Sequence, residues 1–276
     1  MKKKIIIFTL CLGIFFYFQN NFITVNNLEI KSEKIPEDFI GYKIVHLSDL
    51  HNKSFGNNQK HLVQKIKKIK PDLIVFTGDI IDRRRYNEKP SLCLIEEITK
   101  LAPVYYVTGN HEIWSGKFHT LEKKLKQNGA KVLRNEGRVI NKGNSEMLIL
   151  GIDDPAINST YETEEEVVDK EIKQAMIKKY NDKYKILLSH RPEKFLIYSE
   201  NNIDLIFSGH AHGGQVRLPF IGGIIAPNQG FFPKYTKGKY QDENSTMVVS
   251  RGLGNSLAPL RIFNRPEIVV VTLYKK

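Results

Sequence analysis

The sequence is poor in cysteine, and this limits the kinds of site that it can build. Its 276 residues include two cysteines, Cys11 and Cys93. Because Cys11 lies in an apolar run near the N-terminus, the rest of the chain has a single thiol. An internal disulfide in this body and a metal site made of thiolates are therefore excluded. The chain also lacks internal repeats and low-complexity tracts, which excludes a solenoid and a largely disordered protein.

Acidic residues are outnumbered by basic ones. There are 42 lysines and arginines against 30 aspartates and glutamates, which gives a formal net charge of +12. Such an excess suits nucleic acid, an anionic membrane surface or a phosphorylated substrate. Hydrophobic residues make up 41% of the chain, enough for a substantial core in one large domain or two small ones.

The N-terminus, MKKKIIIFTLCLGIFFYFQNN, joins three lysines to an uncharged, mostly apolar run from Ile5 to Phe18. This is the layout of a signal sequence, and no cleavage site of small residues follows it. We therefore expect an uncleaved signal anchor, a transmembrane segment, at residues 1–25. The lysines would stay in the cytoplasm under the positive-inside rule, and a catalytic domain at residues 26–276 would lie outside the cell membrane. The run is shorter than the roughly 20 residues that a full span prefers. The alternative is a buried helix or strand of a soluble fold.

Five short apolar runs each end in polar residues. They are KIVHLSDLH (43–51), DLIVFTGDIID (72–82), VYYVTGNHEIW (104–114), KILLSHRPE (185–193) and DLIFSGHAHGG (204–214). Runs of this kind are typical of strands that helices cover on both faces. Apolar residues recur at helical spacing between most of them, at 57–70, 90–101, 118–128 and 164–180. This alternation predicts an α/β sandwich, with further strands at 147–152 and 268–273.

The polar ends of these runs are expected at one edge of the molecule, because ligands of open α/β sheets sit at the carboxyl ends of the strands. They supply carboxylates, imidazoles and one amide, a set that suits Mn, Fe, Zn or similar divalent ions. The set exceeds the needs of one tetrahedral ion, but two ions that share a carboxylate could use nearly all of it. Two-metal sites of this kind promote in-line phosphoryl displacement. The residues are Asp49, His51, Asp79, Asn110, His111, His190, His210 and His212.

The order of the motifs resembles that of the calcineurin-like metallophosphoesterase superfamily. The family pattern D-x-H, GD-x-x-D, GNH-[DE], an isolated His and GH-x-H occurs at 49–51, 78–82, 109–112, 190 and 209–212. The resemblance implies a four-layer α/β sandwich, in which two packed mixed β-sheets are flanked by helices and the metal site lies at the strand C-terminal ends. It looks closest to bacterial membrane-anchored members, which similarly carry GH-x-HGGQ-x-RLP, here at 209–219, and SRGLG, here at 250–254.

The resemblance also implies a role for each motif residue. Asp49, His51 and His212 would bind one divalent ion, and Asn110, His190 and His210 would bind a second. Asp79 would bridge the two ions, which could be Mn, Fe or Zn. His111 would not be a ligand but the general acid for the leaving group, or an electrostatic clamp on the phosphate. The implied reaction is hydrolysis of a phosphomonoester or phosphodiester by attack of a metal-bridging hydroxide.

Several neighbouring features allow two interpretations. Glu112 either orients His111 or caps a helix, Asp82 either supports the ligands or belongs to a turn, and Arg191 either reaches a substrate phosphate or lies at the surface. His46, inside the first run, is expected to be a packed structural residue. Residues 217–238 form either an irregular loop with a hairpin or an apolar lip near the membrane that admits a lipid tail. The lip would consist of Phe220, Ile221, Ile224, Ile225, Phe231 and Phe232.

The substrate stays open at this point. Some relatives in the wider superfamily cleave the pyrophosphate of UDP-diacylglucosamine lipids, which favours a phosphorylated small molecule or a lipid- or envelope-linked phosphoester. A nuclease would share the chemistry and the positive charge, but an anchor would separate the chain from cytoplasmic nucleic acid, so nucleic acid is not the expected partner. A non-catalytic scaffold of the same fold is a further alternative. Such relatives usually lose metal ligands, and this chain has lost none.

Overall fold

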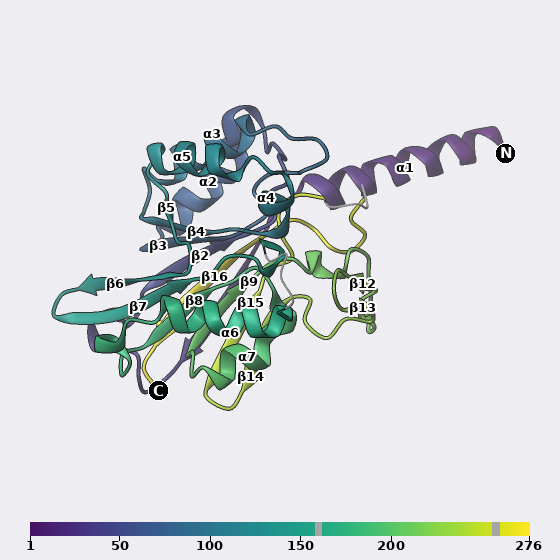
Figure 1. Ribbon diagram of the computed structural model, residues 1–276. Coiled ribbons are helices and arrows are strands. Elements are labelled where there is room, and N and C mark those ends of the chain that lie inside the picture. The colour runs from purple at the N-terminus through teal and green to yellow at the C-terminus, as the bar shows by residue number, and fades with distance from the viewer. Residues whose placement is uncertain (158–161, 256–259) are drawn as a thin grey trace.

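Two six-stranded sheets form the centre of the computed structural model, which describes residues 1–157, 162–255 and 260–276 (Figure 1). The first sheet contains, in spatial order, β1 (Thr24–Lys31), β16 (Glu267–Tyr274), β2 (Lys43–Leu47), β3 (Leu73–Thr77), β4 (Val104–Val107) and β5 (Lys131–Val132). The second contains β14 (Gly238–Asp242), β15 (Ser245–Val249), β9 (Leu205–Ser208), β8 (Lys185–Leu188), β7 (Ser145–Gly151) and β6 (Glu136–Lys142).

Helices and short 3₁₀ turns connect these strands. The α-helices are α1 (Lys2–Asn21), α2 (Lys60–Ile69), α3 (Lys89–Ile98), α4 (Asn110–Trp114), α5 (Phe118–Gln127), α6 (Glu164–Ala175) and α7 (Phe195–Glu200). The 3₁₀ turns are η1 (Glu37–Phe39), η2 (Asn57–Gln59), η3 (Pro155–Ile157), η4 (Lys178–Tyr180), η5 (Pro192–Lys194) and η6 (His212–Gly214). Two small hairpins complete the fold: β10 (Arg217–Leu218) with β11 (Gly222–Gly223), and β12 (Ile225–Ala226) with β13 (Gly230–Phe231).

The layers follow from strands that are apolar on both faces. In β3, Ile74 and Phe76 pack in one core cluster with residues of α2, α3 and α5, whereas Leu73 and Val75 pack against the second sheet. The outer face of the second sheet joins α6 and α7 in a third cluster. Because side chains alternate between the faces of a strand, each sheet is covered by helices on one side and by the other sheet on the other. The predicted four-layer sandwich is confirmed.

Most of the predicted elements are present, with shifted ends. The predicted helix at 57–70 begins as the 3₁₀ turn η2 and continues as α2 to Ile69. The predicted helix at 164–180 ends earlier, at Ala175, because Met176 has an extended backbone with φ −67° and ψ 127°. Thr163 caps its start as a capping box with Glu166.

The N-terminal helix α1 projects from one end of the body (Figure 1). Among the described residues it is the one helix that is long and apolar enough to cross a membrane, by length and composition. Its side chains are exposed or half-buried up to Gln19, so the alternative of a buried core element is wrong. Its last turn is attached to the body: the side-chain oxygen of Asn20 accepts hydrogen bonds from the Arg261 N–H at 3.2 Å and from Asn255 at 3.0 Å.

Candidate metal centre

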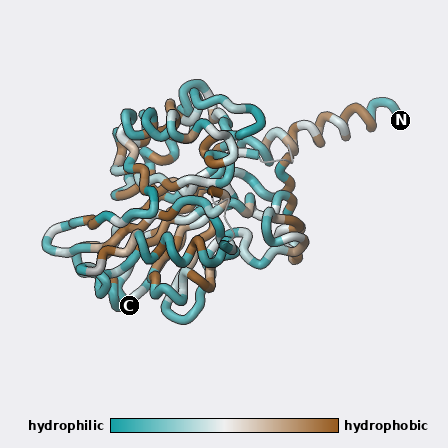
Figure 2. Tube along the Cα trace, viewed as in Figure 1, coloured by the Kyte–Doolittle hydropathy of each residue, from teal (hydrophilic) through white to brown (hydrophobic). Residues whose placement is uncertain are grey.

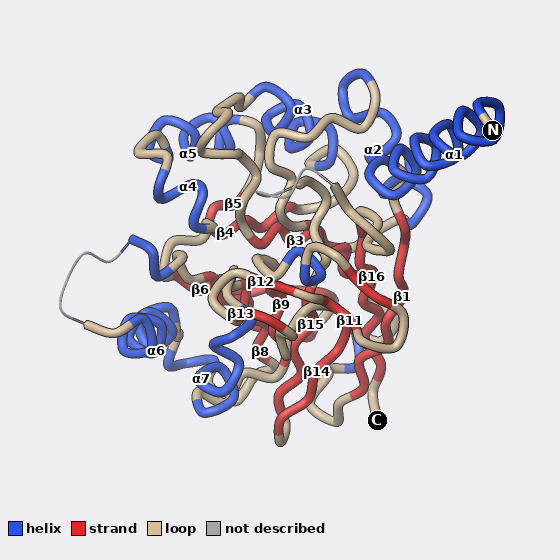
Figure 3. The backbone as a smooth tube through the Cα atoms, turned by 90° about the vertical axis from the view of Figure 1, so that its right-hand side faces the viewer, coloured by secondary structure: helices blue, strands red, loops and turns tan. Residues whose placement is uncertain are grey.

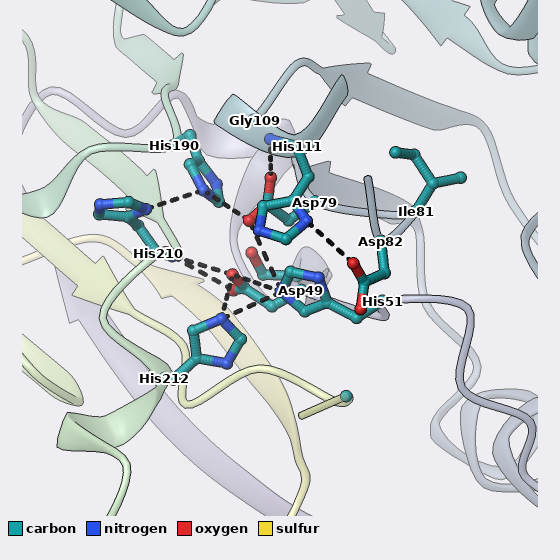
Figure 4. Close-up of polar contacts among 12 residues, drawn as sticks. Asp49, His51, Asp79, Ile81, Asp82, Gly109, His111, His190, His210 and His212 are labelled. Carbon is teal, nitrogen blue, oxygen red and sulfur yellow. Dashed lines mark hydrogen bonds and ion pairs between the residues drawn. The ribbon is translucent and has the colours of Figure 1, made fainter. Parts of the chain in front are cut away.

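The predicted site residues lie in loops at the carboxyl ends of five strands. Asp49 and His51 follow β2, Asp79 follows β3, and His190 follows β8. Asn110 and His111 open α4 directly after β4, and His210 and His212 follow β9. In the first sheet β2, β3 and β4 run parallel, and in the second β8 and β9 do, so these ends meet at one edge. Figure 4 shows the carboxylates and imidazoles converging there.

The backbone of these loops is unusual. Asp49, Asp79 and His210 have left-handed φ values of 53°, 53° and 63°, and His51 and His212 have values of 47° and 46°. Residues other than glycine rarely adopt this region, at a cost of about 1–3 kcal/mol each, and such strain concentrates at functional sites. Five of the eight predicted site residues are therefore held in conformations that packing alone does not favour.

Two motif glycines are required by the close approach of the loops. A Cβ on Gly109 would lie 2.4 Å from Oδ1 of Asp79, and a Cβ on Gly209 would lie 1.9 Å from Oγ of Ser48. Real Cβ atoms do not come so close to other heavy atoms. Any side chain at these positions would push Asp79 or the Asp49 loop away from the centre.

The first group of potential ligands consists of Asp49, His51, Asp79 and His212, all buried, with one ligand atom each within 4.8 Å of the others. Nε2 of His51 lies 3.0 Å from Nε2 of His212 and 3.5 Å from Oδ2 of Asp79. Nε2 of His212 lies 3.3 Å from Oδ1 of Asp49. Nitrogen and oxygen donors thus point at one small volume, as the ligands of a divalent ion do.

The second group consists of Asp79, His190 and His210, again all buried. Nε2 of His190 lies 3.4 Å from Oδ2 of Asp79, and Nδ1 of His210 lies 3.2 Å from Nε2 of His190. Asp79 belongs to both groups, so the residues can hold two ions that share this carboxylate.

In His190 and His210, one ring nitrogen points away from the ligand groups, and its hydrogen bond determines which nitrogen faces them. Nδ1 of His190 lies 2.7 Å from the carbonyl oxygen of Thr77, so it carries the proton and leaves Nε2 free. Nε2 of His210 lies 3.1 Å from the side-chain oxygen of Asn228, so Nδ1 is left free. Metal-binding histidines are usually oriented by a bond of this kind.

The electrostatics of the site also fit a pair of cations. Burial lowers the pKa values of His210 and His212 well below their usual range, which keeps both imidazoles neutral and able to bind metal. Burial would raise the pKa of Asp79 and lower that of His190, but their mutual attraction brings the pKa of Asp79 well below its usual range and raises that of His190 to about 10 in the metal-free site. Asp79 is therefore an anion at the junction of the two groups.

The side chain of Asn110 also fits a bound ion. Its side-chain oxygen is buried and has no hydrogen-bond partner among the described residues. An unpaired buried acceptor costs about 1–3 kcal/mol, so such atoms usually have a partner. An ion bound beside Asp79 would provide that partner. The donor set, the shared carboxylate and this amide oxygen together fit a two-metal site.

His111 lies beside this cluster with its ring 4.5 Å from that of His51. Its backbone N–H donates to Oδ1 of Asp79 at 2.8 Å, and its Nδ1 accepts a hydrogen bond from the Arg83 N–H at 3.2 Å. Oδ1 of Asp82 is 3.7 Å from the same nitrogen. Because Nδ1 is an acceptor, the proton of the neutral ring is on Nε2.

The structure distinguishes the two interpretations of Glu112. Its carboxylate accepts hydrogen bonds from the backbone N–H groups of Asp79 at 2.7 Å, Gly109 at 2.8 Å and Ile81 at 3.2 Å. Glu112 therefore caps α4 and at the same time fixes the Asp79 loop. Asp82 forms a turn, since it accepts from the Arg84 N–H at 2.8 Å, and it also lies near His111.

Arg191 is buried beside the candidate metal centre. The guanidinium is 1% exposed and donates to both oxygens of Asp154 through Nε and Nη2, at 2.7 and 2.8 Å. Its Nη1 lies 3.4 Å from Nε2 of His210. The expectation of surface exposure is wrong, because Asp154 offers a buried partner. Neither Asp154 nor Asn228 was identified from the sequence.

Comparisons with known proteins agree with this geometry. The profile of the family "Calcineurin-like phosphoesterase" matches residues 42–214, a range that contains every predicted site residue. The chain is 33% identical over 264 residues to the uncharacterized metallophosphoesterase YkuE of Bacillus subtilis, covering 93% of this chain and 87% of that protein. An uncharacterized metallophosphoesterase of Aquifex aeolicus is 29% identical over 274 residues, covering 96% and 97%.

A solved structure is similar in fold. The crystal structure of TT1561 of Thermus thermophilus aligns with a TM-score of 0.50 and 14% identity, over 77% of this chain and 90% of that one. The fold and the cluster of histidines and aspartates thus define a phosphoric ester hydrolase with a two-metal site. The chain belongs to the calcineurin-like phosphoesterase family.

Proposed function

We propose that this chain is a membrane-anchored phosphoesterase that hydrolyses a phosphomonoester or phosphodiester outside the cytoplasm with two divalent ions, Mn, Fe or Zn. The observation that carries the proposal is the position of Asp79, which shares Oδ2 between His51 and His190, at 3.5 and 3.4 Å. In this proposal Asp79 bridges the ions. One ion is held by Asp49, His51 and His212, and the other by Asn110, His190 and His210.

Two bound divalent ions supply an activated water molecule and neutralise charge that develops on the phosphoryl oxygens. The protein residues have separate tasks. Asn110 is a neutral ligand, so the centre keeps a net positive charge for an anionic substrate. His111 holds a proton on Nε2 and donates it toward the leaving oxygen. The Arg83 N–H keeps that tautomer in place through Nδ1.

The proposed anchor is α1, with its three lysines on the cytoplasmic side. It is supported by the length and composition of the helix and by the exposure of most of its side chains. The positive-inside rule then places the body on the opposite side of the membrane. Residues 1–25 would act as the anchor and 26–276 as the catalytic domain, although strand β1 already begins at Thr24.

The test compares Asp79→Asn and His111→Ala with the full chain in detergent, loaded with Mn²⁺, using an aryl phosphate and a diaryl phosphate. We expect Asp79→Asn to lose metal and most turnover. His111→Ala should keep its metal but lose about 10²–10⁴-fold in turnover, as for removal of a general acid. The matched control is His119→Ala, an exposed histidine on α5, which should behave as the unmodified chain. Unchanged turnover in both site variants would contradict the proposed mechanism.

A further inference from the structure

The two small hairpins carry the most exposed aromatic side chains of the described body. Phe220 is fully exposed, and Phe231 and Phe232 are 72% and 68% exposed. Phe220 and Phe232 also have left-handed φ values of 68° and 51°, which are unfavourable for a bulky residue. Large exposed apolar patches mark sites of interaction with a protein or a membrane, and these three rings are candidates for such a site.

The chain next to these hairpins is linked to α1 through Ile262 and Phe263. Val216 forms a parallel bridge with Ile262, and the Arg217 N–H donates to the carbonyl oxygen of Ile262 at 3.0 Å. The next residue, Phe263, packs edge-on against Phe15 of α1 with ring centres 5.5 Å apart. Figure 1 shows α1 and the hairpin of β12 and β13 at the same end of the molecule, Figure 3 shows that end facing the viewer, and Figure 2 shows apolar residues on both.

The last turn of α1 is bonded to loops of the body. The Asn20 side chain bonds to Arg261 and Asn255, and the Lys53 ammonium group donates a hydrogen bond to the Asn20 carbonyl oxygen. These bonds place the base of the helix next to Asn255 and Arg261. If α1 crosses a bilayer, the hairpins beside its base meet the headgroup region of that bilayer.

The charge of the surface indicates what covers it. Residues 217–238 and 260–266 contain no aspartate or glutamate. Lys234, Lys237 and Arg265 are exposed within them. Exposed aromatic and basic side chains together, with no acidic ones, are typical of contact with an anionic membrane surface.

The same hairpin reaches the metal centre. Asn228 lies between β12 and β13, and its side-chain oxygen is 3.1 Å from Nε2 of His210. Phe231 pairs with Ile225 in that hairpin, three residues along the chain from Asn228. One small hairpin thus carries both the exposed Phe231 and Asn228, which contacts the proposed metal ligand His210.

We propose that the hairpin residues 217–232 and α1 form one contact surface for an anionic lipid bilayer, and that the site behind it takes a phosphoester carried on a lipid. The membrane contact stands on the surface itself, whereas the substrate class rests on the proposed hydrolytic function. The apolar lip expected from the sequence would then be the part of the enzyme that enters the bilayer.

The first experiment measures the depth of the hairpin in vesicles of phosphatidylcholine and phosphatidylglycerol with brominated acyl chains. The full chain carries Phe231→Trp or, as the matched control, Leu196→Trp, an exposed apolar position on α7. The signal of the native Trp114 is subtracted with the unmodified chain. We expect bromine to quench the tryptophan at 231 and not the one at 196. Equal quenching at the two positions would overturn the proposal, as would burial of position 231 between two copies of the chain.

The second experiment separates the membrane contact from the chemistry. The triple variant Phe220→Ser, Phe231→Ser, Phe232→Ser is compared with Leu196→Ser on an aryl phosphate and on vesicle-borne phosphatidic acid and phosphatidylglycerol. We expect the triple variant to keep its turnover of the soluble substrate and to lose at least about tenfold on a vesicle-borne lipid, a factor that partial burial of three rings readily supplies. Equal loss on both substrates, or no loss on either, would overturn the proposal. So would cleavage of the aryl phosphate but of neither lipid by the unmodified chain. An unmodified, metal-loaded chain inert toward every substrate would instead contradict the proposed function, whatever the quenching shows.

Discussion

The side-chain oxygen of Asn228 accepts a hydrogen bond from Nε2 of His210 at 3.1 Å, and this bond leaves Nδ1 of the same ring directed at His190. A partner that holds the outer nitrogen of a metal-binding histidine typically contributes 10–100-fold to metal affinity or activity. We therefore expect Asn228→Ala to weaken binding of the ion beside His210 by about that factor. Titration of the metal-free chain with Mn²⁺ or Zn²⁺ measures it.

The matched control for Asn228 is Asn27→Ala, an exposed asparagine on β1 far along the chain from the site motifs. It should bind metal as the unmodified chain does. If Asn228→Ala also binds normally, the orientation of His210 is set by other groups, such as Arg191, whose Nη1 lies 3.4 Å from Nε2 of that ring.

Replacement of Glu112 by the neutral Gln should lower the free energy of unfolding. In Glu112→Gln an amide NH₂ would face one or more of the backbone N–H groups of Asp79, Gly109 and Ile81. A buried donor left without an acceptor costs about 1–3 kcal/mol. Denaturant unfolding of the metal-free chain should show a loss of that size, whereas the exposed Glu96→Gln on α3 should show little change. Equal stability of the two variants would mean that the Asp79 loop does not depend on this carboxylate.

The ion pair between Arg191 and Asp154 gives a test of coupling. Both side chains are buried, so Arg191→Leu leaves the Asp154 carboxylate without its partner. Removal of one member of a buried pair costs about 3–5 kcal/mol, whereas removal of both costs less than the two single losses together. The double variant Arg191→Leu, Asp154→Asn should therefore be more stable than the sum of the single variants implies. Additive losses in denaturant unfolding would show that the two residues act independently.

Asp154 and Asn228 could not be identified as site residues from the sequence, because neither stands in one of the family motifs. The predicted site residues follow strands and stand in ordered motifs, so the rule for strand ends locates them. Asp154 follows such a run too, MLILGIDD at 147–154, but no motif singles it out. Asn228 stands in a hairpin, and its contact with His210 depends on how two loops fold over each other rather than on any periodicity.

Strands at the sheet edges were missed for a different reason. The edge strand β1, TVNNLEIK, buries only Ile30 fully and pairs with β16 on one side. A strand of this kind has a weak apolar signal, because solvent rather than a helix covers much of it. Most of the central strands, buried on both faces, were predicted from their composition. The buried strand β15 (STMVV) was missed, because its five residues open with Ser and Thr and give only a short apolar run.

His46 is fully buried in β2 and contributes no atom to the metal groups found among the described residues. Its Nε2 lies 2.8 Å from Oγ1 of Thr77, and its Nδ1 has no partner in the described part of the chain. Burial lowers the pKa of His46 to about 3, because a charged ring would carry a second N–H into an apolar setting. In the unfolded chain the pKa returns to about 6.5.

Between pH 6.5 and about 3, His46 is thus protonated in the unfolded chain but neutral in the folded chain. The free energy of unfolding should fall with decreasing pH by about 1.4 kcal/mol per pH unit from this residue, and not change with it above pH 7. His46→Gln removes that contribution, so the stability advantage of the unmodified chain over the variant should shrink at this slope as the pH is lowered. The samples are metal-free and at constant ionic strength, so that the other histidines contribute equally to the pH dependence of unfolding in both chains. Parallel stability curves for the two chains would show that His46 keeps an ordinary pKa in the folded protein.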